Sequence, residues 1–159
     1  MNKPIRKATR CYILDKDKVL VIKYNEPNRK AGWYDIPGGK IEEGETPVQT
    51  AIREVAEETT LKVDKLERKG KLIVEYPDRI FDFEVFVAKE FDGIPAELQE
   101  NSSRWIEIDE LLSKNNIFSC IQLLSEKYIN YLKDENSDFK IHIYVDNDEN
   151  IENIQVGGI

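Results

Sequence analysis

Residues 38–61 read GGKIEEGETPVQTAIREVAEETTL. In this stretch Thr46 offers an N-cap hydroxyl, Pro47 takes the first helical position and Gln49 the third, which together form the start of a capping box. The sequence therefore predicts a helix over residues 47–59. Its apolar stripe follows the spacing i, i+3, i+4, i+7 and i+11 and consists of Val48, Ala51, Ile52, Val55 and Thr59.

Three carboxylates, those of Glu54, Glu57 and Glu58, fall on roughly the opposite side of this helix. Like charges at these spacings repel by about a few tenths of a kcal/mol each, and the C-terminal half of a helix disfavours anions. A hard divalent cation such as Mg²⁺ or Mn²⁺ would account for them, because it takes oxygen ligands and bridges carboxylates to substrate phosphates. A solvated acidic face without a metal is the alternative.

The residues around the helix favour a ligand site. Pro37-Gly38-Gly39 directly after a predicted strand lets the backbone approach a ligand closely, with a carbonyl aimed at a metal or an N–H at a phosphate. Arg53 is placed to bind Glu45 of the preceding loop through its guanidinium fork. For this pair we expect a salt bridge rather than direct catalysis.

The pattern from Gly39 to Leu61 resembles the Nudix box, Gly-x5-Glu-x7-Arg-Glu-aliphatic-x-Glu-Glu-x-Gly-aliphatic, at every specified position except Thr60, where the family has Gly. A β-branched residue is costly in the left-handed conformation that is typical just past a helix end. We therefore expect the turn after this helix to take another geometry. The resemblance implies an α/β (α+β) Nudix fold, a mixed β-sheet sandwiched between helices, over residues 5 to about 132.

The resemblance also implies an activity, the metal-dependent hydrolysis of the pyrophosphate linkage in a nucleoside diphosphate derivative. WYDIPGGK (residues 33–40), EYPD (75–78) and the strand around Trp105 are most similar to the MutT-like branch, which includes oxidised-purine nucleoside triphosphatases. A purine nucleoside triphosphate, cleaved to the monophosphate and pyrophosphate, is the expected substrate. The alternatives are an NDP-sugar or dinucleoside polyphosphate hydrolase, or a nucleotide sensor without catalysis.

The family's functional residues carry over onto matching positions. The implied ligands of Mg²⁺ or Mn²⁺ are Gly38 (through its carbonyl), Glu54, Glu57, Glu58 and Glu100. The implied catalytic residues are Arg53, Glu54, Glu58 and Glu100, and which carboxylate is the general base stays open. Glu100 matches a distal metal-binding or basic glutamate, against the alternative of an ordinary exposed loop residue.

Four residues are candidates for binding the substrate. Lys23 and Lys40 are the expected phosphate contacts, and Gly39 lies beside Lys40. Asp35 matches a position that reads the base, and a carboxylate there can accept hydrogen bonds from guanine N1–H and the 2-amino group together. This favours purines over pyrimidines, although an ordinary strand-end Asp is the alternative.

The remaining pattern completes a single predicted domain, residues 1–159, with a C-terminal β extension at about 138–156. Alternation and turn signals predict strands that include a hairpin at the start of the chain and another at its end, together with two late helices. The strands are expected at 8–14, 18–24, 33–36, 70–76, 80–89, 104–108, 139–145 and 151–156, and the helices at 109–113 and 118–133. The stripe of the longer helix consists of Ile121, Leu124, Tyr128, Tyr131 and Leu132.

Composition limits the partners. The 159 residues carry a formal net charge of −8 and show no basic stripe, which argues against polymeric nucleic acid. No apolar run approaches the roughly 20 residues needed to cross a bilayer, so we expect a cytoplasmic protein, monomer or homodimer, that binds a small nucleotide. Cys11 and Cys120 are expected to be reduced and buried, and the single His142 to be an ordinary strand residue.

Overall fold

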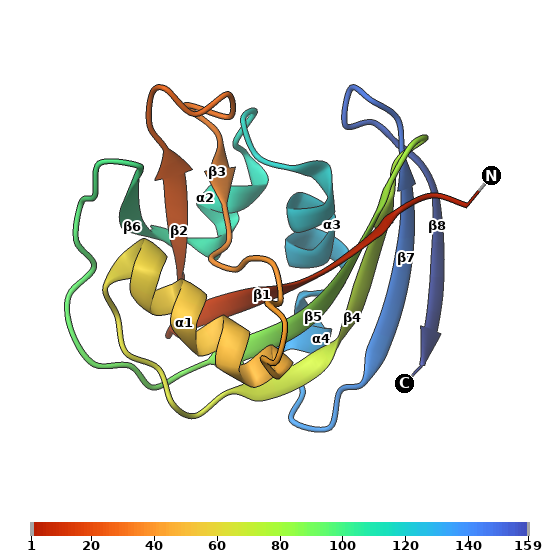
Figure 1. Ribbon diagram of the computed structural model, residues 1–159. Coiled ribbons are helices and arrows are strands. Elements are labelled where there is room, and N and C mark those ends of the chain that lie inside the picture. Colours follow the sequence, from red (N-terminus) through yellow and green to blue (C-terminus); the bar gives the residue numbers. More distant parts are fainter. Residues whose placement is uncertain (1, 159) are drawn as a thin grey trace.

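The computed structural model describes residues 2–158, whose strands form one eight-stranded mixed sheet (Figure 1). Its order is β3-β2-β1-β5-β4-β7-β8. Strand β6 lies off this path and pairs with β2 along the whole length of β2, whereas β1 and β3 each pair with only two residues of β2. The pairs β1–β5 and β4–β7 are parallel and the other pairs are antiparallel. The strands are β1 (Ile5–Asp15), β2 (Lys18–Tyr24), β3 (Tyr34–Asp35), β4 (Glu67–Glu75), β5 (Ile80–Ala88), β6 (Asn101–Glu107), β7 (Phe139–Val145) and β8 (Ile151–Gly158).

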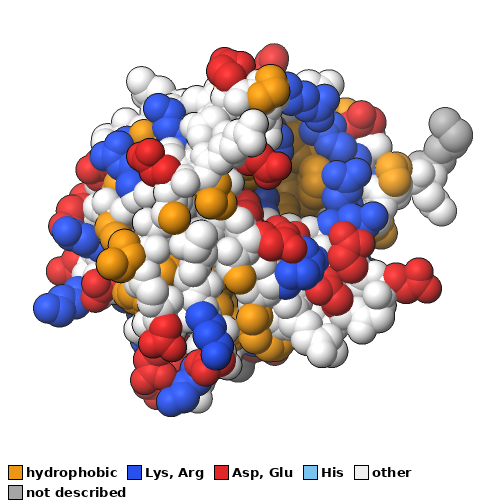
Figure 2. All heavy atoms as spheres, turned by 60° about the vertical axis from the view of Figure 1, so that its left-hand side comes forward, with side chains coloured by type: hydrophobic (Ala, Val, Ile, Leu, Met, Phe, Trp, Pro, Cys, Tyr) orange, Lys and Arg blue, Asp and Glu red, His pale blue; other side chains and the backbone are white. Residues whose placement is uncertain are grey.

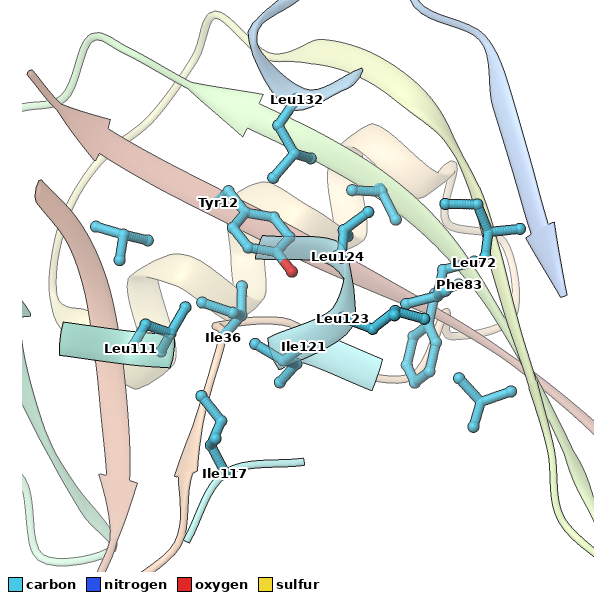
Figure 3. Packing of buried hydrophobic residues seen from close by; sticks show 14 of the residues in the cluster. Tyr12, Ile36, Leu72, Phe83, Leu111, Ile117, Ile121, Leu123, Leu124 and Leu132 are labelled. Carbon is cyan, nitrogen blue, oxygen red and sulfur yellow. The ribbon is translucent and has the colours of Figure 1, made fainter. Parts of the chain in front are cut away.

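Helices cover both faces of this sheet, as the fold prediction requires. They are α1 (Pro47–Thr59), α2 (Ile108–Leu112), α3 (Ser119–Lys127) and α4 (Ile129–Lys133). Strand β1 contributes side chains to the hydrophobic cores on both faces of the sheet, because successive side chains of a strand point to opposite faces. Cys11 and Ile13 pack with Val55 of α1, whereas Tyr12 and Leu14 belong to the core under α2, α3 and α4. Figure 3 shows Tyr12 close to residues of α3 and α4 in this second core.

Helix α1 has the predicted bounds and the predicted cap. The N–H of Gln49 donates to Thr46 Oγ1 at 3.2 Å, and the N–H of Thr46 donates to Gln49 Oε1 at 2.9 Å. Ala51 and Val55 are fully buried, but Val48 is 42% exposed, so its place in the buried stripe was wrong. Val48 lies in the first turn, and the inner side of that turn is instead filled by Thr50.

The turn after α1 corrects a second expectation. Thr60 adopts the left-handed conformation, with φ 65° and ψ 4°, despite its β-branched side chain. Its N–H donates to the Ala56 carbonyl at 3.0 Å, and its hydroxyl lies within hydrogen-bond distance of two carbonyl oxygens, that of Thr59 at 2.5 Å and that of Ile94 at 3.2 Å. The geometry favoured by glycine is therefore retained without a glycine.

The predicted helix 118–133 is also wrong, because it is two helices. Tyr128 has φ −118° and ψ 17° and separates α3 from α4. After this break Leu132 is fully buried and Tyr131 stacks on Phe139 of β7, with 5.6 Å between ring centroids. Packing onto the sheet thus explains the interruption. The other predicted strands and the short helix are confirmed to within a few residues at their ends.

The remaining predictions concern single side chains. Cys11 is buried and Cys120 half-buried, both are free, and burial raises the pKa of each thiol to about 12. His142 is a half-buried strand residue whose Nε2 lies 2.9 Å from Glu75 Oε1. Within residues 2–158, no helix has the length and apolar character needed to cross a membrane.

Candidate active site

Arg53 of α1 joins the loop before the helix to the carboxylates on it. Its Nε and Nη2 donate to the two oxygens of Glu45 at 2.7 and 2.9 Å, and its Nη1 donates to Glu54 at 3.0 Å and to Glu57 at 3.2 Å. Hydrogen bonds from Arg53 hold the pKa of Glu45 at about 2. The predicted Arg53–Glu45 salt bridge is confirmed, and the same guanidinium offsets part of the charge on the helix face.

The Pro37-Gly38-Gly39 segment lies between β1 and α1. The carbonyl of Pro37 accepts from the N–H of Cys11 at 2.8 Å, and the Gly39 carbonyl accepts from the N–H of Thr9 at 2.9 Å. Between them, the N–H of Gly38 faces the helix and donates to Glu58 Oε1 at 2.9 Å. A Cβ on Gly38 would lie 2.0 Å from the Thr9 carbonyl oxygen, so only glycine fits this close approach.

The three helix carboxylates differ in their environment. Glu57 is the most exposed, with 57% of its side chain accessible, whereas 18% of the Glu54 side chain is accessible. Burial raises the pKa of Glu58 to about 8 and also raises the pKa of Glu54. The protein therefore does not fully replace the hydration that the ionised carboxylates of Glu54 and Glu58 lose on burial. A bound cation would stabilise these negative charges.

The donor chemistry of this face fits a hard divalent cation, because carboxylate oxygens dominate it and neither His nor Cys belongs to the face. In the part of the chain that the structure describes, no three acidic, His or Cys side chains already converge as a metal cage. The reason is visible in the contacts above, since Arg53 binds Glu54 and Glu57 while the Gly38 N–H binds Glu58.

Glu100 lies near the end of α1 but makes no contact with this cluster among the described residues. Its side chain is exposed, and its backbone carbonyl accepts from the N–H of Asn25 at 2.9 Å. The next residue, Asn101, donates from Nδ2 to the Glu58 carbonyl at 2.7 Å, which anchors the loop to the helix. The role of Glu100 as a ligand or base stays a prediction.

A cleft of about 830 Å³ opens beside this cluster, and Figure 2 shows it as a hollow flanked by basic side chains. Trp33 and Phe118, whose ring centroids are 5.1 Å apart, form part of one wall, and Tyr76 and Phe81 contribute to another. Six cations also line the cleft: Arg6, Lys7, Arg29, Lys30, Lys40 and Arg79. In a protein of net charge −8, this concentration of positive charge favours an anionic ligand.

Lys40 connects the cleft to the carboxylates, but Lys23 does not lie in the cleft. The backbone carbonyl of Lys40 accepts from Arg53 Nη2 at 3.3 Å, while the residue itself lines the cleft. The ammonium of Lys23 lies over the ring of Tyr34, 5.6 Å from its centroid. Lys23 is absent from the described residues that line the cleft.

An inner pocket of about 50 Å³ continues from the cleft and contains Asp35. Phe81 and Phe118 border both spaces. Asp35 is only 1% exposed, and its Oδ2 accepts from the Tyr24 hydroxyl at 2.8 Å and lies 3.5 Å from Arg10 Nη2. The Asp35 carboxylate is therefore held in place by other side chains before any substrate arrives.

Arg10 and Tyr24 are site residues that the sequence reasoning missed. Arg10 lies over the ring of Phe83, 4.4 Å from its centroid, and lines the inner pocket with Asp35. One sequence signal was present, because Arg10 shares the apolar face of its strand with Tyr12 and Leu14. A charged residue on a buried face points to a partner or a ligand.

Comparison with known proteins identifies the family. The NUDIX domain model matches residues 4–123. The chain belongs to the Nudix family. Oxidized purine nucleoside triphosphate hydrolase of Danio rerio is 29% identical over 128 residues, which cover 76% of this chain and 82% of the relative. The 8-oxo-dGTP diphosphatase of Escherichia coli is 27% identical over 94 residues, 59% of this chain and 73% of the relative.

A solved structure shows the same Nudix fold. The mutator MutT protein from Bacillus halodurans superimposes with a TM-score of 0.78 at 24% identity, covering 95% of this chain and 97% of the other. Nudix hydrolases act on small nucleotide substrates and generally use divalent metals. The C-terminal strands β7 and β8 lie beyond the residues that the domain model matches.

Proposed function

We propose that the chain is a metal-dependent pyrophosphohydrolase that cleaves a purine nucleoside triphosphate, including oxidised forms, to the monophosphate and pyrophosphate. One observation carries the proposal: Lys40 of the cation-lined cleft is hydrogen-bonded to Arg53, which itself binds two of the three helix carboxylates. Phosphates drawn into the cleft would therefore lie beside the carboxylates. In the reaction, a water oxygen attacks phosphorus, the P–O bond to pyrophosphate breaks, and the water loses a proton.

Glu54, Glu57 and Glu58, with the Gly38 carbonyl and Glu100, would hold Mg²⁺ or Mn²⁺. When bound, the cation would neutralise phosphate oxygens and lower the pKa of the attacking water. Arg53 keeps Glu54 and Glu57 oriented, and the Gly38 N–H does the same for Glu58. A carboxylate among Glu54, Glu58 and Glu100 takes the proton of the water, and variants must decide which one does.

The inner pocket would take the base. Phe81, Phe83 and Phe118 line it and supply aromatic surfaces for a flat ring. Asp35 lies among them; its Oδ1 accepts from the Ile36 N–H at 2.8 Å and its Oδ2 from the Tyr24 hydroxyl, and the second lone pair of each oxygen would suit the N1–H and 2-amino donors of a guanine-type base. The similarity to proteins named for oxidised purine nucleotides supports the same substrate class.

A nucleotide panel with identified products tests this function. The panel contains purine and pyrimidine triphosphates, 8-oxo-dGTP, NDP-sugars and dinucleoside polyphosphates, each assayed with Mg²⁺, with Mn²⁺ and with excess EDTA. We expect pyrophosphate and a nucleoside monophosphate from the purine triphosphates, and no turnover in EDTA. Preferred cleavage of NDP-sugars or dinucleoside polyphosphates would show that these, and not purine triphosphates, are the substrates. Tight binding of nucleotides without turnover would indicate a sensor.

We also propose that residues 1–159 act as a single domain. The hairpin of β7 and β8 extends the same sheet through the parallel pairing of β7 with β4. Its turn contributes to the cleft through Glu149. Deletion of the hairpin is therefore expected to expose the β4 edge and to impair folding.

A further inference from the structure

The turn between β7 and β8 reaches the substrate cleft. Glu149 in this turn lines the cleft, and its Oε1 accepts a hydrogen bond from the hydroxyl of Tyr76 at 2.9 Å. Tyr76 directly follows β4 and lines both the cleft and the inner pocket that holds Asp35. Glu149 is therefore at the end of the cleft that adjoins the inner pocket.

The turn holds Glu149 in a defined position. The carboxylate of Asp146 accepts from the N–H of Asn150 at 2.9 Å, from the N–H of Asp148 at 2.8 Å and from Asn150 Nδ2 at 3.1 Å. These hydrogen bonds lower the pKa of Asp146. Glu149 itself has φ 66°, a left-handed conformation that non-glycine residues adopt only where the surroundings enforce it. The turn is thus built to present this side chain.

Glu149 has the opposite charge to its surroundings. Among the described residues that line the cleft, six are cations and Glu149 is the single carboxylate. The guanidinium of Arg79 lies 4.0 Å from the centroid of the Tyr76 ring. Burial lowers the pKa of Lys30, and the carboxylates of Asp35 and, to a smaller extent, Glu149 oppose that shift. A carboxylate repels phosphate and accepts hydrogen bonds from uncharged donors.

We propose that Glu149 is a specificity-determining residue that accepts a hydrogen bond from an uncharged donor on the nucleoside part of the substrate. Because it repels phosphate from its own end of the cleft, it also orients the nucleotide with the phosphates toward Lys40. The proposal rests on the function proposed above. Two donors share the required chemistry, a sugar hydroxyl and an exocyclic amine of the base.

Glu149→Gln tests the proposal, because it removes the charge and one acceptor oxygen while keeping the shape. For GTP we expect KM to rise about tenfold with kcat little changed, since the lost contact is equally strong in the ground state and the transition state. Inorganic tripolyphosphate, used as a competitive inhibitor, is expected to bind as tightly as before or more tightly, because phosphate is no longer repelled. Asp148→Asn makes the same charge change on an exposed residue of the same turn and is expected to leave both values unchanged.

Two GTP analogues identify the donor. If Glu149 accepts from the sugar, 2′,3′-dideoxy-GTP should bind wild type and Glu149→Gln equally well. If it accepts from the 2-amino group, wild type and Glu149→Gln should instead bind ITP equally well, because ITP lacks that group. An equal loss for GTP, dideoxy-GTP and ITP would overturn the contact with an uncharged donor, and so would weaker binding of tripolyphosphate.

Failure of this inference is separable from failure of the proposed function. Wild type that hydrolyses no nucleotide contradicts the function, yet calorimetric binding of GTP and tripolyphosphate would still report on Glu149. Normal GTP kinetics in Glu149→Gln contradict the inference alone. Tyr76→Phe supplies a second variant, because it removes the hydroxyl that holds Glu149 and should raise the KM for GTP by a smaller factor.

Discussion

Gly39 and Glu54 lie so close together that a Cβ on Gly39 would be 2.4 Å from the carboxyl carbon of Glu54. A Cβ on Gly39, in the loop that precedes α1, can therefore be accommodated only if the end of the Glu54 side chain moves. This contact explains in steric terms why glycine stands at the first position of the box. It also links the position of the loop directly to the position of a proposed metal ligand.

Gly39→Ala should therefore displace Glu54 and reduce activity. A misplacement of this size is expected to lower kcat by about 10- to 100-fold. Steady-state kinetics at saturating Mg²⁺ measure the effect, and Gly157→Ala is the control because a Cβ there meets nothing within 4 Å. Wild-type kcat in Gly39→Ala would mean that Glu54 has room to move without consequence.

Thr60→Gly is expected to stabilise the protein. The left-handed conformation of a non-glycine residue costs about 1 kcal/mol or more, and glycine adopts it freely. The substitution also removes the hydrogen bond of the Thr60 hydroxyl, which is worth about 0.5–1.5 kcal/mol, so we expect a net gain of less than about 1 kcal/mol and a Tm higher by less than about 4 °C. A lower Tm would show that this hydrogen bond outweighs the backbone strain.

The start of α1 and the break at Tyr128 separate what local sequence can predict from what it cannot. The start of α1 was predicted because Thr46, Pro47 and Gln49 interact within a single helical turn. The break at Tyr128 was missed because it depends on the stacking of Tyr128 on Tyr131 and of Tyr131 on Phe139 of β7. Signals within a few residues of sequence are enough to predict the start of α1, but they do not predict a helix break that depends on contacts with a distant strand.

The same division holds for the site. The carboxylate face and the Arg53–Glu45 pair followed from helical spacing and from eight residues of separation. The contact between Tyr76 and Glu149 joins residues 73 positions apart, and its existence depends on the pairing of β4 with β7. Residues that complete a cleft from distant strands are therefore those that sequence patterns leave out.

Asp35→Asn should affect purine nucleotides more than pyrimidine nucleotides. If Asp35 accepts two hydrogen bonds from a guanine-type base, the amide retains only one acceptor, and kcat/KM for GTP should fall about tenfold more than for CTP. The variant should also melt at a lower temperature, because Arg10 loses the counter-ion it has in a buried setting. Equal losses for GTP and CTP would show that Asp35 does not read the base.

The stability of the metal-free protein should fall as the pH rises from about 5 to 8. Burial raises the pKa of Glu58 to about 8, so the folded state retains a proton that the unfolded state has already lost in this range. Unfolding therefore becomes more favourable with rising pH through this group, and Glu58→Gln should flatten the dependence. Thermal melts of both proteins in EDTA across this range measure it, and identical pH profiles would contradict the assigned ionisation.

The carboxylates themselves give the most direct test of the enzyme assignment. Each of Glu54→Gln, Glu57→Gln and Glu58→Gln keeps the side-chain shape and removes one negative charge. If these residues hold the cation and couple it to the attacking water, kcat should fall by about 10² to 10⁵. The metal-free Tm should stay the same or rise, because like-charge repulsion on the helix face is relieved at Glu54 and Glu57 and because Glu58→Gln removes a carboxyl whose ionised form is disfavoured by burial. Glu43→Gln, an exposed residue of the same box loop, is the matched control and should leave kcat unchanged.

The combination of the two measurements is what distinguishes the possible roles of this face. A solvated acidic face predicts normal turnover in all three variants. A salt-bridge network around Arg53 predicts lower stability for Glu54→Gln and Glu57→Gln, which contact the guanidinium, but not for Glu58→Gln, whose partner is the Gly38 N–H. A metal site predicts collapsed activity at unchanged or raised metal-free stability, together with loss of the Tm increase that Mg²⁺ is expected to produce in wild type. Near-normal kcat in all three variants would remove the hydrolase mechanism from this helix.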